Sequence, residues 1–375
     1  MRVLLTTDTI GGVWTYTREL TEGLLERAHS ISLVSFGRPP SPDQLTWCSR
    51  MSARYPNAFL YQPTHIPLEW MEANESAYAA AEPLILDLAQ TFGADLLHSN
   101  QFCFGKLPLA LPKLVVAHSD VLSWAAACHP RGLDPSPWLG RYKDHVEAGL
   151  SHASAVAAPT HWMLDALSRN FPLPGQAYVI LNGRDIPPAP SILPRNLQAI
   201  TAGRLWDPAK GLSLLNDVQS PIPMLIAGEI RRETTTAAPP LGGTTLLGHI
   251  DDQSLINLLR SSSIYLALSI YEPFGLAPLE AALCGCAILA NDLPSLREVW
   301  GSAALFFNDA GSLSALLSRL ASDPILLRNA QRRALDRACY LTRSRMVEQY
   351  LDLYHHLLDL ALPLHPAPTE VPVHV

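Results

Sequence analysis

Residues 269–292 read SIYEPFGLAPLEAALCGCAILAND, and this stretch sets the fold class of the chain. An apolar strand, Ile264–Leu268, ends just before it, a tight Glu-Pro-Phe-Gly turn follows, and Leu276–Leu283 has the pattern of a helix. A second apolar strand, Ala287–Ala290, comes after that helix. Apolar strands that alternate with helices indicate a parallel sheet, because such strands are buried on both faces and need crossover connections.

The same alternation continues over most of the chain. Helices are expected at Thr15–Arg27, Thr160–Arg169 and Asp251–Ser261, with Thr160 as an N-cap. We therefore predict an α/β fold with two doubly wound Rossmann-like domains that face each other across a cleft. The other strand candidates are Val3–Thr7, Ile31–Phe36, Leu96–His98, Leu114–His118, Ala155–Ala158, Tyr178–Leu181, Ala199–Ala202, Met224–Ala227, Thr245–Leu247 and Ala304–Phe307.

A proline-rich segment separates the two halves. The chain has 375 residues, which is too long for one ordinary hydrophobic core. Residues 184–196 read RDIPPAPSILPRN, which can neither continue a helix nor lie inside a sheet. We predict an N-terminal domain at 1–184, a linker at 185–196 and a C-terminal domain at 197–345. Residues 346–375 are expected to form a helix that packs back on the N-terminal domain, followed by a tail.

Composition and charge exclude several classes of protein. The formal charge of −7 argues against a nucleic-acid partner, and 48% apolar residues argue against long disordered regions. The start, MRVLLTTDTIGGVW, is typical of a buried first strand, and no window is apolar enough to span a membrane, so we expect a cytoplasmic protein. Six irregularly placed cysteines suggest no disulfide framework; Cys284 and Cys286 are interpreted as packing residues rather than metal ligands.

The turn in the opening stretch has the chemistry of a ligand site. Gly275 allows close approach of a ligand to the backbone, and the helix that begins at Leu276 offers free N–H groups to a phosphate. Glu272 and Glu280 carry carboxylates, which accept hydrogen bonds from vicinal hydroxyls. The alternative is a helix cap with a surface glutamate.

Three further segments offer groups at strand ends. Arg204 and Lys210, in TAGRLWDPAKGLSLL, can converge on one diphosphate; alternatively they are solvated cations beside a loop. Gly11 and Gly12, in DTIGGVW, begin a helix after the first strand but lack the third glycine of a dinucleotide fingerprint, so a purely structural turn is the alternative. His118 ends an apolar strand and is either a cleft residue or a structural histidine. Weaker cleft candidates are Asp120, Asn100 and His98.

At these motifs the chain resembles the family 4 glycosyltransferases of GT-B fold. Their signature is E-x-F-G with a second glutamate eight positions after the first, and Glu272, Phe274, Gly275 and Glu280 match it. The resemblance implies that Glu272 contacts the donor sugar and that Glu280 binds the ribose. It also implies that the backbone of Gly275 and Leu276 approaches sugar and phosphate.

The resemblance assigns roles to the other segments too. It implies that Arg204 and Lys210 bind the diphosphate, that Gly11 and Gly12 face it, and that His118 lies near the donor sugar. Backbone atoms around Ile250 would contact the base of the nucleotide. The sequence therefore does not distinguish a uridine from a guanosine donor. After Asn182 and Gly183, Arg184 replaces the small apolar residue that is usual in the family.

The resemblance implies a retaining, metal-independent sugar transfer from a UDP- or GDP-sugar, with Glu272, His118, Arg204 and Lys210 as catalytic residues. The sequence contains no Asp-x-Asp motif that could hold a divalent cation. No other cofactor is expected. The acceptor could be a small molecule, a glycan or a lipid, and membrane association is not indicated. Residues 63–70 line an acceptor site or form a surface loop. Alternative functions are a nucleotide-sugar epimerase of the same fold and a non-catalytic protein that binds sugar nucleotides.

Overall fold

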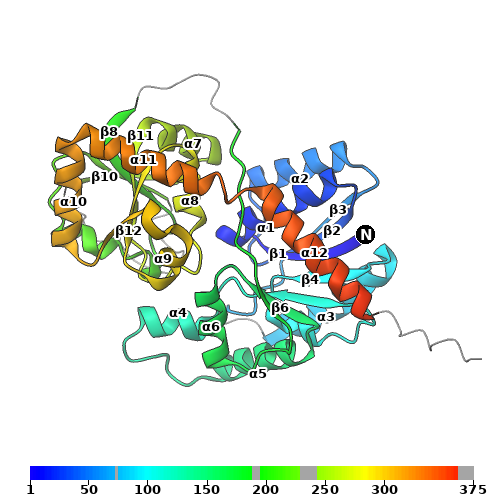
Figure 1. The fold of residues 1–375 in the computed structure, drawn as a ribbon. Coiled ribbons are helices and arrows are strands. Elements are labelled where there is room, and N and C mark those ends of the chain that lie inside the picture. Colours follow the sequence, from blue (N-terminus) through cyan, green and yellow to red (C-terminus); the bar gives the residue numbers. More distant parts are fainter. Residues whose placement is uncertain (72–74, 188–194, 229–242, 362–375) are drawn as a thin grey trace, which may run out of the picture.

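The computed structural model describes residues 1–71, 75–187, 195–228 and 243–361. It contains two parallel sheets, each with helices on its faces (Figure 1). The predicted α/β class with two Rossmann-like domains is thus confirmed. Part of the predicted linker, residues 188–194, lies outside the described residues.

The N-terminal sheet has seven strands in the order β3-β2-β1-β4-β5-β6-β7. Each neighbouring pair is parallel, and β1 occupies the centre between β2 and β4. Its middle strands are buried along their length because both faces are covered by helices. The strands are β1 (Arg2–Asp8), β2 (Ser30–Phe36), β3 (Phe59–Pro63), β4 (Leu96–Ser99), β5 (Lys113–Val116), β6 (Ala155–Ala158) and β7 (Ala177–Val179).

The helices of this domain begin mostly at side-chain caps. Ser41, Asp120, Ser136 and Thr160 each accept a hydrogen bond from a backbone N–H of the following first turn, which satisfies a group that the helix leaves unpaired. The cap predicted at Thr160 is confirmed. The helices are α1 (Gly12–Glu26), α2 (Pro42–Arg54), α3 (Glu75–Phe92), the short η1 (Phe102–Lys106), α4 (Val121–Cys128), α5 (Pro137–His152) and α6 (His161–Asn170).

The C-terminal sheet has six parallel strands in the order β10-β9-β8-β11-β12-β13. They are β8 (Asn196–Ala202), β9 (Met224–Ala227), β10 (Thr244–Gly248), β11 (Ser262–Ala267), β12 (Ala287–Asn291) and β13 (Leu305–Phe307). The helices are η2 (Pro208–Lys210), η3 (Leu212–Asp217), α7 (Asp252–Ser261), α8 (Leu276–Leu283), α9 (Pro294–Trp300), η4 (Gly301–Ala303), α10 (Ala310–Ser322) and α11 (Pro324–Ala338). Cys284 and Cys286 are buried in the core of this domain. None of the helices in the described parts of the chain is long and apolar enough to cross a membrane.

The last helix, α12 (Arg343–Ala361), belongs in space to the N-terminal domain. It lies beside α1 (Figure 1), and Tyr350 and Tyr354 are fully enclosed in the same core as Tyr16. The chain therefore crosses between the domains twice, and the two crossings touch. A β-carbon on Gly183 would lie 2.0 Å from the carbonyl oxygen of Thr342, so only glycine permits this approach.

Candidate functional site

The turn after β11 is held by packing beneath it. Phe274 is only 3% exposed and lies in the core of the C-terminal domain. Its side chain therefore fixes the turn from below, and any contact with a ligand is left to its backbone. Gly275 follows with φ of 92°, a conformation that favours glycine, and it caps the first turn of α8. The Leu276 side chain reaches the opposite domain, where a β-carbon on Gly12 would lie 3.5 Å from its Cδ1.

Glu272 and Lys210 form the central ion pair of the site. Lys210 Nζ lies 2.8 Å from Glu272 Oε2, although the two residues come from different connections of the sheet. The Ser269 hydroxyl donates to the same carboxylate oxygen at 3.0 Å, and the Ser295 hydroxyl donates to the Glu272 carbonyl at 2.6 Å. Both side chains are about four-fifths buried, at 23% and 18% exposed. The carboxylate is thus fixed in place before any ligand arrives.

A shallow recess opens beside this pair at the carboxyl ends of β8 and β11. Such an edge is where ligands bind in open parallel sheets. Gly203 at the end of β8 lies against Lys210, where a β-carbon would be 3.5 Å from its Cε. The lining of the recess includes Thr201, Gly203, Lys210, Ser269, Glu272 and Pro278.

Arg204 points from the C-terminal domain toward the first turn of the N-terminal domain. Its Nη1 would be 3.2 Å from a β-carbon on Gly11, and its Nη2 donates to Asp207 Oδ2 at 2.9 Å. Gly11 has φ of 76° and precedes α1. The structure therefore brings the predicted cation of one domain against the predicted glycine turn of the other, next to the recess that holds Lys210.

His118 lies two residues beyond the end of β5, which stops at Val116 rather than at His118 as the sequence predicted. Its Nε2 is 2.8 Å from Oδ1 of Asn100, whose amide nitrogen donates to the Thr6 carbonyl. Nε2 therefore carries the proton, and Nδ1 remains an acceptor. Burial lowers the pKa of His118 to about 3, so the ring stays neutral at physiological pH. Its ring also meets Tyr16 edge-on at a centroid separation of 4.4 Å.

Two of the weaker candidates have structural roles instead. His98 is fully buried between the hydroxyls of Tyr16 and Tyr354, at 3.1 and 2.6 Å. Burial lowers its pKa to about 3, so it serves the core as a neutral ring. Asp120 caps α4 through the Ser123 amide. Both side chains are buried, so neither is available to a ligand in the cleft.

Glu280 is paired with the residue that departs from the family pattern. Arg184 Nε donates to Glu280 Oε1 at 2.9 Å, and its Nη1 contacts Glu19 of α1. Glu280 lies on α8, and its side chain is 14% exposed. Ile250 is partly buried and directly precedes Asp251, the N-cap of α7.

Several contacts between the domains were not predicted from the sequence. Thr160 donates to the carbonyl of Pro273 at 2.8 Å, and the hydroxyls of Ser119 and Tyr271 meet at 2.9 Å. Glu298 accepts hydrogen bonds from the backbone N–H groups of His161 and Trp162 at the start of α6. The first two contacts join the Glu272 turn to the N-terminal domain and the third joins α9 to it, and no local pattern in the sequence indicated them.

Asp8 was also missed as a residue of the site. It ends β1 directly before the glycine turn, and its Oδ1 accepts from the Ile10 N–H at 3.2 Å. Burial raises its pKa to about 7, against the opposing effects of that hydrogen bond and of Arg204. A buried carboxyl whose pKa is raised toward neutrality and that faces an arginine is a candidate for a functional position.

The segment at residues 63–70 is partly buried, and its residues 66–69 line a second recess, which lies in the N-terminal domain. Leu68 and Glu69 are buried, and the Glu69 carboxylate accepts from the N–H groups of Phe102 and Cys103 at 2.9 and 3.0 Å. The segment therefore anchors the start of η1.

Comparison with known proteins matches both halves of the chain. Residues 10–186 match the model of Glycosyltransferase Family 4, and residues 210–337 match that of Glycosyl transferases group 1. Phosphatidyl-myo-inositol mannosyltransferase of Mycolicibacterium smegmatis is 23% identical, over 92% of this chain and 90% of that protein. The serotype-specific mannosyltransferase WbdA of Escherichia coli is 28% identical over 33% of this chain. The matched region covers only 15% of that protein.

Solved structures share the whole fold. The sucrose-phosphate synthase of Thermosynechococcus elongatus superposes with a TM-score of 0.77 at 19% identity, covering 96% of this chain and all of that one. Anabaena Alr3699/HepE, solved in complex with UDP-glucose, has a TM-score of 0.69 at 15% identity, covering 95% of this chain and 100% of that one.

Proposed function

We propose that this chain, which belongs to the family 4, group 1 glycosyltransferases of GT-B fold, transfers a hexose from a nucleotide-diphosphate sugar to an acceptor. In this proposal the transfer retains the anomeric configuration and needs no obligatory metal. The observation that carries this proposal is the ion pair of Lys210 and Glu272 at the recess. It places one carboxylate and one cation where a sugar and its phosphate would meet.

In the proposed reaction, Glu272 accepts hydrogen bonds from hydroxyls of the donor sugar. The bond between the anomeric carbon and the diphosphate oxygen breaks, and the acceptor oxygen bonds to the same face of that carbon. The acceptor proton passes to the leaving diphosphate. Negative charge grows on the diphosphate, and Lys210, Arg204 and the N-terminal N–H groups of α8 would stabilise it.

His118 would contribute as a neutral hydrogen-bond acceptor. Its Nε2 is occupied by Asn100, so Nδ1 is the ring atom free to accept from a hydroxyl of donor or acceptor. The donor nucleotide would be UDP or GDP, with Ile250 at the base and Glu280 at the ribose. The complex of Alr3699/HepE with UDP-glucose supports a donor of this class.

A thermal-shift panel tests the proposal. A ligand that binds only the folded state raises the unfolding temperature, by an amount equivalent to about 2.7 kcal/mol at a hundredfold excess over its Kd. We expect UDP or GDP, and the corresponding hexose conjugates, to stabilise the protein in the presence of EDTA, whereas NAD does not. The absence of any shift with all four nucleotide ligands would contradict the proposed donor class.

The anomer of the product tests the second part of the proposal. Transfer from an α-linked nucleotide sugar should yield an α-glycoside, which proton NMR identifies from the anomeric coupling constant. A β-glycoside would contradict retention. Loss of transfer on adding EDTA, with recovery on adding a divalent cation, would contradict metal independence.

A further inference from the structure

Arg184 lies at a junction of three parts of the molecule. It is the residue at the first crossing between the domains, and its guanidinium reaches Glu19 on α1 and Glu280 on α8. The three side chains are 11%, 5% and 14% exposed. Its backbone N–H donates to the Leu341 carbonyl of the second crossing at 3.0 Å. A charged side chain therefore connects the first crossing to α8, the helix that carries Glu280.

We propose that Arg184 is a positioning residue for Glu280, which it holds as an oriented, ionised carboxylate that accepts hydrogen bonds from the ribose hydroxyls of the donor. This inference rests on the proposed function, because it assumes that a nucleotide occupies the cleft.

The surroundings of Glu280 explain why it needs a cation. Burial raises the pKa of the Glu280 carboxyl, and the charge of Arg184 opposes that effect. Without the guanidinium, the buried carboxyl would take up a proton more readily and become a hydrogen-bond donor at one oxygen. Arginine suits this position because its guanidinium keeps its charge when buried, whereas a lysine loses its charge more easily.

The geometry leaves room for a ligand on the same carboxylate. Within the described residues, Arg184 is the hydrogen-bond partner of the Glu280 side chain and contacts Oε1. Oε2 is therefore left for a hydroxyl. A carboxylate has acceptor capacity for several hydrogen bonds, so the arginine and a ribose can share it.

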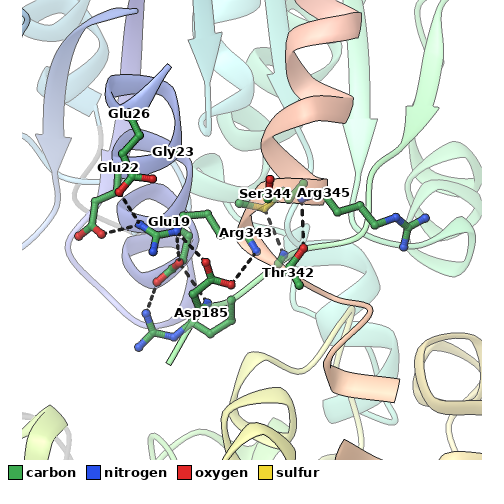
Figure 2. Close-up of polar contacts among 12 residues, drawn as sticks. Glu19, Glu22, Gly23, Glu26, Asp185, Thr342, Arg343, Ser344 and Arg345 are labelled. Atoms are coloured by element: carbon green, nitrogen blue, oxygen red, sulfur yellow. Dashed lines mark hydrogen bonds and ion pairs between the residues drawn. The ribbon is translucent and has the colours of Figure 1, made fainter. Parts of the chain in front are cut away.

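A second arginine anchors the arrangement from the opposite side. Arg343 Nε lies 3.3 Å from Glu19 Oε2, and its Nη1 lies 2.7 Å from Glu22 Oε2. Figure 2 shows Arg343 between these glutamates and Asp185, with Nε 3.2 Å from Asp185 Oδ2. Glu19 is thus shared by two arginines, and its fixed carboxylate holds Arg184 in the orientation that points Nε toward Glu280.

Ribose discrimination tests the inference. Calorimetric Kd values would be measured for UDP and GDP and for their 2′,3′-dideoxy counterparts, on the full chain. For the nucleotide that binds, we expect the wild type to prefer the ribonucleotide by about tenfold or more, the size of a charged hydrogen bond.

Arg184→Met should lose most of this preference, and Arg184→Lys should keep more of it. Arg343→Met loosens Glu19 but removes no contact to Glu280, so it should lower stability and keep more of the preference than Arg184→Met does.

A double-mutant cycle covers the case in which Arg184→Met does not fold. Glu280→Gln removes the buried charge that Arg184 faces on α8. We therefore expect the protein to fold with Arg184→Met in the Glu280→Gln background. If the arginine acts through the carboxylate, it should have no further effect on the preference there. A loss of preference in the double variant beyond that of Glu280→Gln, or a wild-type preference in Arg184→Met, would overturn this inference but not the proposed function. A wild type that binds neither nucleotide would overturn the proposed function with it.

Discussion

A β-carbon on Gly11 would lie 3.2 Å from Nη1 of Arg204, so the first turn of the N-terminal domain touches the guanidinium of the C-terminal domain. The contact joins the glycine backbone of one domain to a cation of the other. The absence of a side chain at Gly11 therefore determines where Arg204 can lie.

Gly11→Ala is expected to affect both stability and ligand binding. With φ of 76° and ψ of −148°, a region essentially restricted to glycine, an alanine costs about 1–3 kcal/mol of unfolding free energy, and its methyl group displaces Arg204. Gly132→Ala is the matched control, because Gly132 has φ of 72° and no neighbour within 4 Å. Both variants should lose stability in denaturant unfolding, because each places a β-carbon at a positive φ. Only Gly11→Ala should weaken the calorimetric affinity for a nucleotide sugar, and equal affinities would contradict the assigned position of Arg204.

Lys210→Met is expected to weaken nucleoside-diphosphate binding by about 1.5–3 kcal/mol, the range for a hydrogen bond to a charged group. The side chain lines the recess and lies 2.8 Å from Glu272. Lys143→Met, at an exposed position of α5, is the control for loss of a positive charge. Titration calorimetry measures both. If the two variants bind equally well, the diphosphate lies elsewhere.

Asp8→Asn is expected to stabilise the protein in a pH-dependent manner. An aspartate in the unfolded chain titrates near 4, whereas burial raises the pKa of Asp8 to about 7. Between these values the folded protein holds a proton that the unfolded chain has released, so stability falls as the pH rises from about 4 to 7. Above 7 the wild type carries a buried carboxylate, at a cost of about 4 kcal/mol at most.

The melting temperature of Asp8→Asn should therefore exceed that of the wild type at pH 8, and the difference should shrink toward pH 5. Asparagine keeps an oxygen for the Ile10 N–H. Asp134→Asn, at an exposed loop position, serves as the control and should show no such trend. A difference that is independent of pH would contradict the titration of Asp8.

Glu298→Ala is expected to loosen the contact between the domains. The carboxylate accepts from two N–H groups at the start of α6, so its removal costs about 1 kcal/mol, as does the loss of a helix cap. Small-angle scattering should show a larger radius of gyration for the ligand-free variant. Glu147→Ala, an exposed position of α5, should leave the radius unchanged. An unchanged radius in both variants would show that the remaining contacts hold the domains closed.

The core strands could be predicted because both faces of each sheet are covered. A strand such as β6 is apolar at every position, and its predicted bounds match the structure. The edge strand β3 was missed because its burial is partial, with Phe59 buried and Leu60 53% exposed. Helix α3 was missed as well; it contains Pro83, which is unfavourable inside a helix.

The site could be predicted in part for a similar reason. Glu272 and Lys210 both follow strand ends, and parallel strands bring such residues to one edge. Pairs that join the domains depend on how the two units face each other, which local sequence does not encode. Arg184 was therefore interpreted as a departure from the family pattern, whereas the structure places its guanidinium on Glu280.

The position of α12 has a consequence for synthesis on the ribosome. The core around Tyr16 and His98 is closed by Tyr350 and Tyr354, which are translated after the whole C-terminal domain. The N-terminal domain emerges first but lacks these side chains until then. His98 would meanwhile keep the hydroxyl of Tyr16 but lack that of Tyr354. We therefore expect a nascent chain released before residue 343 to expose this apolar surface and to be a substrate for chaperones.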